Sequence, residues 1–201
     1  MKPKHIAWTL GALGALALMA WFTLRFAAPN VIVAGQKATE KQAVHSLRTL
    51  LWAQDKFIER YGRAGTLAEL AGRVPLDPPL NTPLLRSPLD VAIPLADGEA
   101  AGASGYLVRI TPKGRDWVAV AWPEKRGESG AFAFCINGFE DIVQSPADAA
   151  GQGYDGVRRV PAGDACVTKP GPRLTPGTGA DGGQWDHWRG RTTRRARAST
   201  P

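Results

Sequence analysis

The residues of this chain whose types could do chemistry are its two cysteines and three histidines. His5, His45 and His187 lie far apart in the sequence, and none has a partner at the spacing of metal ligands. The sequence contains no serine-nucleophile motif, phosphate-binding loop or dinucleotide-binding fingerprint. We therefore predict a protein that is not an enzyme, with no cofactor, no metal site and no evident small-molecule substrate.

The two cysteines indicate a different kind of chemistry. Cys135 lies in the apolar run AFAFCIN, and Cys166 lies in a region rich in Gly and Pro. An even pair of cysteines in an exported domain can form a disulfide, and two unpaired thiols are the alternative. If Phe132, Phe134 and Ile136 face one side of a strand, Cys135 faces the other side. A bond to Cys166 would then hold the later segment across that second face.

The N-terminal residues indicate the compartment. No residue from Ile6 to Leu24 is charged, and at about 1.5 Å per residue this run would span roughly 28 Å as a helix. Lys2 and Lys4 precede it, which favours a cytoplasmic N-terminus. We predict that residues 1–27 anchor the chain in the inner membrane by a single pass, with the main domain periplasmic or extracellular. A signal peptide cleaved after Ala17 is the alternative.

A helix must follow this run and cover the sheet that carries Cys135. Thr39 and Gln42 have the spacing of a capping box, and Gly62 is a suitable helix end. Between them, apolar residues recur at steps of three and four, which predicts an amphipathic helix. The face predicted to pack on the sheet includes Leu47, Leu50, Leu51, Phe57 and Ile58.

The sheet is predicted from four short runs, GYLVRIT, DWVAVAW, GAFAFCI and EDIVQ. Short turns such as Asn137-Gly138 separate them, which favours an antiparallel meander. A small sheet cannot bury its apolar face alone, so the helix is its natural cover. Residues 74–104 precede the sheet, and six prolines between Pro75 and Pro94 predict an irregular surface loop there.

The composition changes again near Pro146, where Gly, Pro, Asp, Ala and Arg become dominant. This change predicts a mostly disordered tail over residues 146–201. The fold class is therefore α+β: an N-terminal transmembrane helix, an amphipathic helix on a small antiparallel β-meander over residues 28–145, and the tail. Part of the net charge of +7 lies in the tail, at Arg189, Arg191, Arg194, Arg195 and Arg197.

In the order of its predicted elements, the chain resembles type IV pilins and the pseudopilins of type II secretion. The stretch AVHSLRTLLWAQDKFIERYGRAGTLAEL is similar to the pilin-like segment in which a helix ends at Tyr-Gly before a T-L-x-E-L turn. The stretch GYLVRITPKGRDWVAVAWPEKRGESGAFAFCINGFEDIV is similar to their sheet. The resemblance covers about Lys41 to Gln144. The chain departs from true prepilins because no Gly-Phe or Gly-Met cleavage signal precedes the apolar run, and no acidic residue precedes Glu40.

The resemblance implies a membrane-anchored, pilin-like protein of a bacterial envelope or secretion assembly. Its partners would be the membrane and other envelope or pilin-like proteins. Pilins often close their C-terminal region with a disulfide, and the resemblance implies the same role for Cys135 and Cys166. The alternative is an exported binding module whose basic tail contacts anionic polymer or lipid. A solvated tail without a partner is the simpler interpretation of those arginines.

Overall fold

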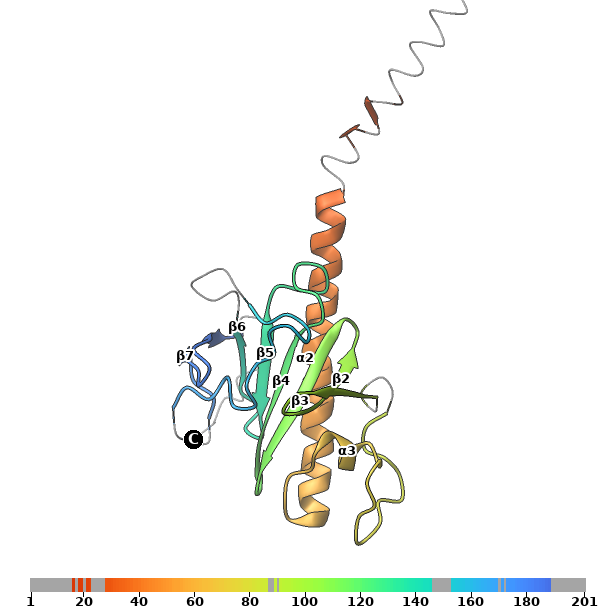
Figure 1. Cartoon of the computed structure of the whole chain (residues 1–201), viewed down its shortest axis with the longest axis vertical. Coiled ribbons are helices and arrows are strands. Elements are labelled where there is room, and N and C mark those ends of the chain that lie inside the picture. Colours follow the sequence, from red (N-terminus) through yellow and green to blue (C-terminus); the bar gives the residue numbers. More distant parts are fainter. Residues whose placement is uncertain are drawn as a thin grey trace, which may run out of the picture.

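A computed structural model describes residues 16, 18–19, 21–22, 28–86, 89, 91–145, 153–169, 171 and 173–188. A long helix covers one face of an antiparallel sheet, and the C-terminal part of the described chain covers the other face (Figure 1). The helices are α2 (Ala28–Tyr61) and α3 (Leu67–Leu70). The strands are β1 (Ala92–Leu95), β2 (Gly98–Ala103), β3 (Tyr106–Lys113), β4 (Asp116–Pro123), β5 (Ala133–Asn137), β6 (Ile142–Ser145), β7 (Gly177–Thr178) and β8 (Gln184–His187).

Helix α2 begins well before the predicted capping box. It starts at Ala28, and Pro29 is tolerated because the first turn of a helix needs no backbone N–H donor. Thr39 is therefore an interior residue, whose hydroxyl oxygen lies 2.8 Å from the Gln36 carbonyl oxygen one turn earlier. Gly62 ends the helix as expected, because its φ of 71° is a left-handed conformation that glycine adopts without strain.

The inner face of α2 forms the main hydrophobic core with the sheet. Leu47, Leu50 and Phe57 are fully buried, whereas Leu51 and Ile58 are partly buried against the same core. Burying a side chain of this size contributes about 1.5–3 kcal/mol. The sheet residues that meet this face include Tyr106, Val108, Ile110, Ala119, Phe134 and Ile136.

The sheet is larger than the predicted meander. Within the described residues its eight strands follow the order β1-β2-β3-β4-β5-β6-β8-β7, and neighbouring strands pair antiparallel. The prediction of an irregular loop over residues 74–104 is wrong at its end, where β1 and β2 form a hairpin. Pro94 is compatible with β1 because this strand lies at the edge of the sheet.

The predicted disordered tail is also corrected. The described residues between 153 and 188 add β7 and β8 to the sheet edge and pack over its second face. There Tyr154, Cys166 and Trp185 are buried with Trp122 and Cys135 of the sheet. The sequence signal for order in this segment is its aromatic residues, Tyr154 and Trp185. The high Gly and Pro content around them had favoured a prediction of disorder instead.

The N-terminal part of the predicted fold needs a correction of its own. No helix within the described residues is long and apolar enough to cross a membrane, so the predicted transmembrane helix is not supported. Most of residues 6–24, on which that prediction rested, lie outside the described residues.

Candidate functional site

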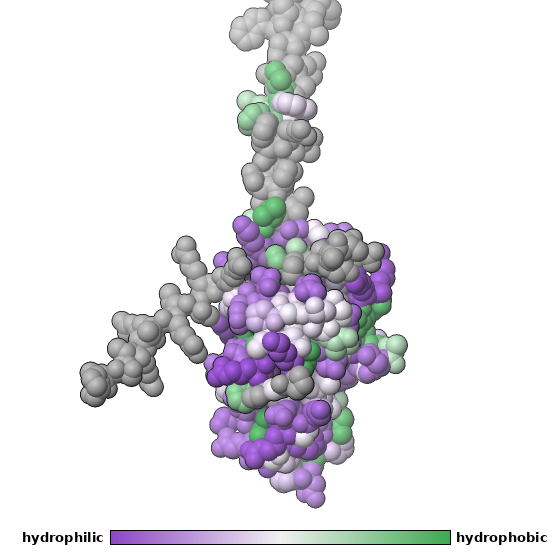
Figure 2. Space-filling view, turned by 90° about the vertical axis from the view of Figure 1, so that its left-hand side faces the viewer, coloured by the Kyte–Doolittle hydropathy of each residue, from purple (hydrophilic) through white to green (hydrophobic). Residues whose placement is uncertain are grey.

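The most distinctive feature of the molecule is the part of α2 that projects beyond the sheet (Figure 1). The helix has 34 residues, and among its side chains that the structure describes, from Val33 onward, the first buried one is Ala43. Side chains from Val33 to Gln42 are exposed or half-buried. We call residues 28–42 the projecting half. Figure 2 shows hydrophobic residues on the narrow part of the chain above the domain, whose own surface on this side is mostly hydrophilic or neutral.

The described residues before α2 are apolar and exposed. Leu16, Leu18, Met19, Trp21 and Phe22 each expose more than half of their surface, between 59% and 70%. Large exposed apolar side chains gathered in one region are typical of protein–protein or membrane interaction sites.

The β4–β5 loop braces the base of the projecting half. The Gln36 amide donates to the Gly127 carbonyl, and the Thr39 hydroxyl donates to the Ser129 carbonyl. The Ala131 N–H donates to Glu40 Oε1 at 3.0 Å. These three contacts fix the direction in which the helix leaves the domain.

A buried tyrosine supports the same loop from the core. The Tyr106 hydroxyl donates to the Phe132 carbonyl at 2.9 Å. Burial raises the pKa of the Tyr106 phenol, and the nearby Glu40 carboxylate raises it further. The phenol therefore stays protonated and remains a donor. Gly130 packs directly against this ring, where no other residue would fit without displacing it.

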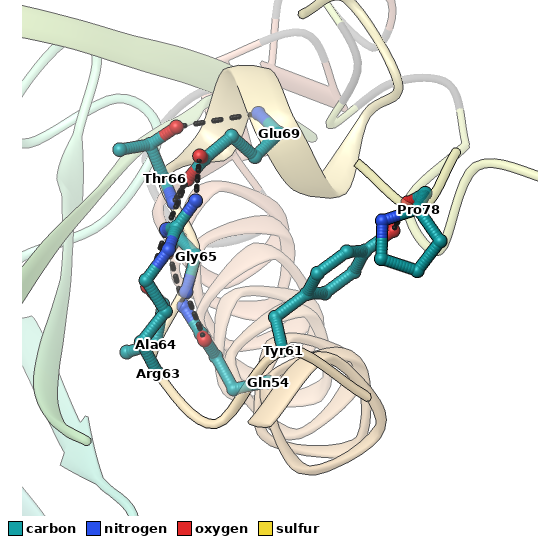
Figure 3. A network of polar contacts seen from close by, with 8 residues as sticks. All are labelled: Gln54, Tyr61, Arg63, Ala64, Gly65, Thr66, Glu69 and Pro78. Carbon is teal, nitrogen blue, oxygen red and sulfur yellow. Dashed lines mark hydrogen bonds and ion pairs between the residues drawn. The ribbon is translucent and has the colours of Figure 1, made fainter. Parts of the chain in front are cut away.

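The other end of α2 is fixed by a buried amide, as Figure 3 shows. Gln54 Nε2 donates to the Gly65 carbonyl at 2.6 Å, and the Gly65 N–H donates to Gln54 Oε1 at 2.9 Å. Thr66 and Glu69 then form the capping box of α3, as their spacing indicated. Arg63 NH2 lies 2.5 Å from Glu69 Oε1. This guanidinium and the Thr66 N–H both lower the pKa of the Glu69 carboxyl.

The two cysteines form a disulfide on the second face of the sheet. Cys135 on β5 is bonded to Cys166, with their Cα atoms 6.4 Å apart, and both residues are fully buried. Strand alternation placed Cys135 opposite the helix face, and it lies in the second core rather than in the core under α2. The bond attaches the C-terminal segment to the centre of the sheet.

Arg109 is a second attachment point that the sequence reasoning missed. Its NH1 donates to Asp97 at 2.6 Å, its NH2 donates to the Pro161 carbonyl at 2.5 Å, and its guanidinium lies 5.8 Å from the Trp122 ring centre. Nε is buried without a partner among the described residues. The sequence signal for this contact was the strand position of Arg109, because alternation along β3 directs its side chain to the second face of the sheet. It joins the β1–β2 turn to the C-terminal segment.

A cleft of about 1300 Å³ surrounds the end of the β3–β4 hairpin. Its described lining carries charges of both signs, including Asp97, Arg109, Arg115 and Asp164, but no histidine or cysteine. Within the described ranges there is no group of three His, Cys, Asp or Glu residues able to hold a metal ion. The described lining offers no paired nucleophile and base.

The remaining predicted site residues are scattered. His45 is exposed on α2, His187 is exposed on β8, and His5 lies outside the described residues. The five tail arginines from Arg189 to Arg197 also lie outside them. The described chain ends at Trp188, whose ring centre lies 5.6 Å from the Arg48 guanidinium on α2.

No family model, curated protein or solved structure matches this chain.

Proposed function

We propose that this chain is a non-enzymatic, exported, pilin-like protein of a bacterial envelope or secretion assembly. In this proposal, the projecting half of α2 makes the contacts with neighbouring subunits. The globular domain presents the sheet and the C-terminal segment to the exterior.

One observation carries the proposal: α2 is much longer than the sheet it covers. A helix that only covered this sheet would need little more than the buried stretch that begins at Ala43. Instead it extends by residues 28–42, and Gln36, Thr39 and Glu40 hold that extension in one direction. Beyond these contacts the helix continues to Ala28, towards the exposed apolar residues that precede it, and such an extension is suited to an interface.

The disulfide favours an oxidising compartment. Disulfides persist in exported proteins and are rare in the bacterial cytosol. The pairing of Cys135 with Cys166 therefore agrees with export of the domain.

A charge placed on the projecting half tests the proposal. Val33 is 47% exposed on α2, and Val157 is 66% exposed on the C-terminal segment. We expect V33E to abolish the assembly of the full chain in envelope extracts, as judged by native electrophoresis and immunoblotting. The matched variant V157E should assemble like the unaltered protein. Equal assembly of both variants, or an unaltered protein that is always monomeric, would contradict the proposal.

A further inference from the structure

The β4–β5 loop, residues 124–132, contacts both the projecting half of α2 and the C-terminal segment. On one side it holds Gln36, Thr39 and Glu40, as described above. On the other side it is bonded to the part of the C-terminal segment around Asp155. The loop therefore connects two parts of the chain that are more than one hundred residues apart.

The bonds between the C-terminal segment and this part of the sheet involve the backbone. The Arg126 N–H donates to Asp155 Oδ1 at 2.9 Å. The Gly156 N–H donates to the Pro123 carbonyl at 2.9 Å, and the Gly156 carbonyl accepts from Trp122 Nε1 at 2.9 Å. These contacts hold the end of β4 and the start of the loop against the segment.

Two glycines let the segment approach the loop this closely. A Cβ atom at Gly156 would lie 2.5 Å from the Glu124 carbonyl oxygen, and one at Gly153 would lie 2.9 Å from Arg126 Nε. Gly156 also has a φ of 48°, a left-handed conformation that glycine adopts without strain. The residues at both positions are therefore suited to this contact, which a larger side chain would disrupt.

Bonds within the loop link its two contact regions. The Ser129 N–H donates to the Lys125 carbonyl at 2.8 Å, and the Gly127 N–H donates to the Gly130 carbonyl at 2.9 Å. The carbonyls of Gly127 and Ser129 are also the acceptors for the Gln36 and Thr39 side chains of α2. A restraint applied to the loop by the C-terminal segment can thus reach the helix.

The projecting half depends on such support to stay helical. Its described side chains are exposed or half-buried, so it gains little stability from the core. Helices of this length are marginal in water without tertiary packing. Gly35 lowers the helix propensity further, because glycine is among the least favourable residues in a helix interior.

We propose that attachment of the C-terminal segment to the sheet keeps the projecting half of α2 helical, through the β4–β5 loop. The Cys135–Cys166 bond is the covalent part of that attachment. It forms when the two thiols lose two electrons and two protons to the disulfide of a thiol–disulfide exchange partner, which becomes a dithiol. Oxidation of the chain then completes the surface used for assembly, a consequence that rests on the proposed function.

Hydrogen exchange at the α2 amides, followed by NMR on the purified full chain, tests the proposal. D155A removes the acceptor of the Arg126 N–H. It should speed exchange at residues 37–42, by about tenfold if the whole contribution of a bond to a carboxylate reaches the helix. Exchange at residues 47–53, most of which pack on the sheet, should stay unchanged. C135A/C166A should also speed exchange at residues 37–42.

D155N is the matched control. Its amide oxygen can still accept from the Arg126 N–H, although it loses the ion pair with Arg158 as D155A does. It should exchange like the unaltered protein. E40A removes the acceptor of the Ala131 N–H on the helix side of the loop. The effects of E40A and D155A should be less than additive, because both break the same connection.

Several results would overturn the proposal. Unchanged exchange at residues 37–42 in D155A or in C135A/C166A would do so. Equally fast exchange in D155N and D155A would show that the bond to the loop is not the cause, and additive effects of E40A and D155A would show two independent supports. An equal increase at residues 47–53 in D155A would show general destabilisation. None of these measurements depends on assembly, so the proposed function can fail or hold separately.

Discussion

Removing the Cys135–Cys166 bond should release the C-terminal segment without unfolding the helix and sheet. The bond joins residues that are 31 positions apart. Closing a loop of that length contributes about 3.7 kcal/mol in the chain-entropy model. For a domain of this size, each kcal/mol shifts the melting temperature by roughly 2–4 °C, so C135A/C166A should melt roughly 7–15 °C lower.

The rest of the attachment is noncovalent and weaker. Trp122 Nε1 donates to the Gly156 carbonyl at 2.9 Å, and Arg109 NH2 donates to the Pro161 carbonyl at 2.5 Å. Such bonds contribute about 0.5–1.5 kcal/mol each when neutral and about 1.5–3 kcal/mol when charged. Limited proteolysis of C135A/C166A should therefore cut residues 153–188 first and leave the part from α2 to β6 intact.

Calorimetry with and without reductant is the assay for this prediction. The unaltered protein should lose stability on reduction, whereas the double variant should not respond. The reasoning is refuted if reduction leaves the melting temperature of the unaltered protein unchanged, or if proteolysis cuts the α2–β6 part as fast as the C-terminal segment.

Four other substitutions test the packing and charges of α2. Leu50→Ala should lower the free energy of unfolding in urea by about 2–5 kcal/mol, because it opens a cavity between α2 and the sheet. The exposed control Lys56→Ala should cost under about 0.5 kcal/mol. Equal costs would show that Leu50 does not lie on the face of α2 that packs on the sheet. Gln54→Ala should cost about 1–3 kcal/mol because it leaves two buried backbone groups of the next loop without partners, and a cost like that of the lysine variant would contradict this. Partial burial raises the pKa of Asp55, and repulsion from Glu140 raises it further, so its ionised form opposes folding. Asp55→Asn should therefore be more stable than the unaltered protein at pH 7, with the gain shrinking as the pH falls towards 4, and a gain that grows on acidification would exclude this cause.

The parts of the fold that the sequence predicted well are those with strong periodicity. The inner positions of α2 from Leu47 to Ile58 follow a helical repeat, and the runs that became β3 and β4 alternate cleanly around a Gly turn. Thr66 and Glu69 form their capping box because that motif needs only local spacing. In these segments local preference and tertiary packing favour the same conformation.

The parts that could not be predicted depend on contacts distant in the sequence. The β1–β2 hairpin is rich in Ala and Gly and contains Pro94, so its order comes from pairing with β3 rather than from its own residues. The described residues between 153 and 188 are ordered because Tyr154 and Trp185 are buried against the sheet and Cys166 is covalently attached to it. Thr39 was mistaken for a helix start because its spacing to Gln42 is also compatible with a helix interior.

The contacts that hold the projecting half also join residues that are distant in the sequence. Gln36, Thr39 and Glu40 contact residues about ninety positions later, and no short motif encodes that pairing. The Arg48–Trp188 contact joins residues even further apart. Alternation and periodicity identify the elements of this fold, but they do not show which surface of α2 is free.

Photo-cross-linking in living cells tests most directly whether the projecting half is an assembly interface. A photoreactive residue placed at Val33, on that half, should form specific cross-links to the same envelope or pilin-like proteins in every preparation. The same residue at Val157, which is also exposed, should form none. Cross-links from Val157 but not Val33, or their absence from both positions in a properly exported protein, would contradict the proposed function.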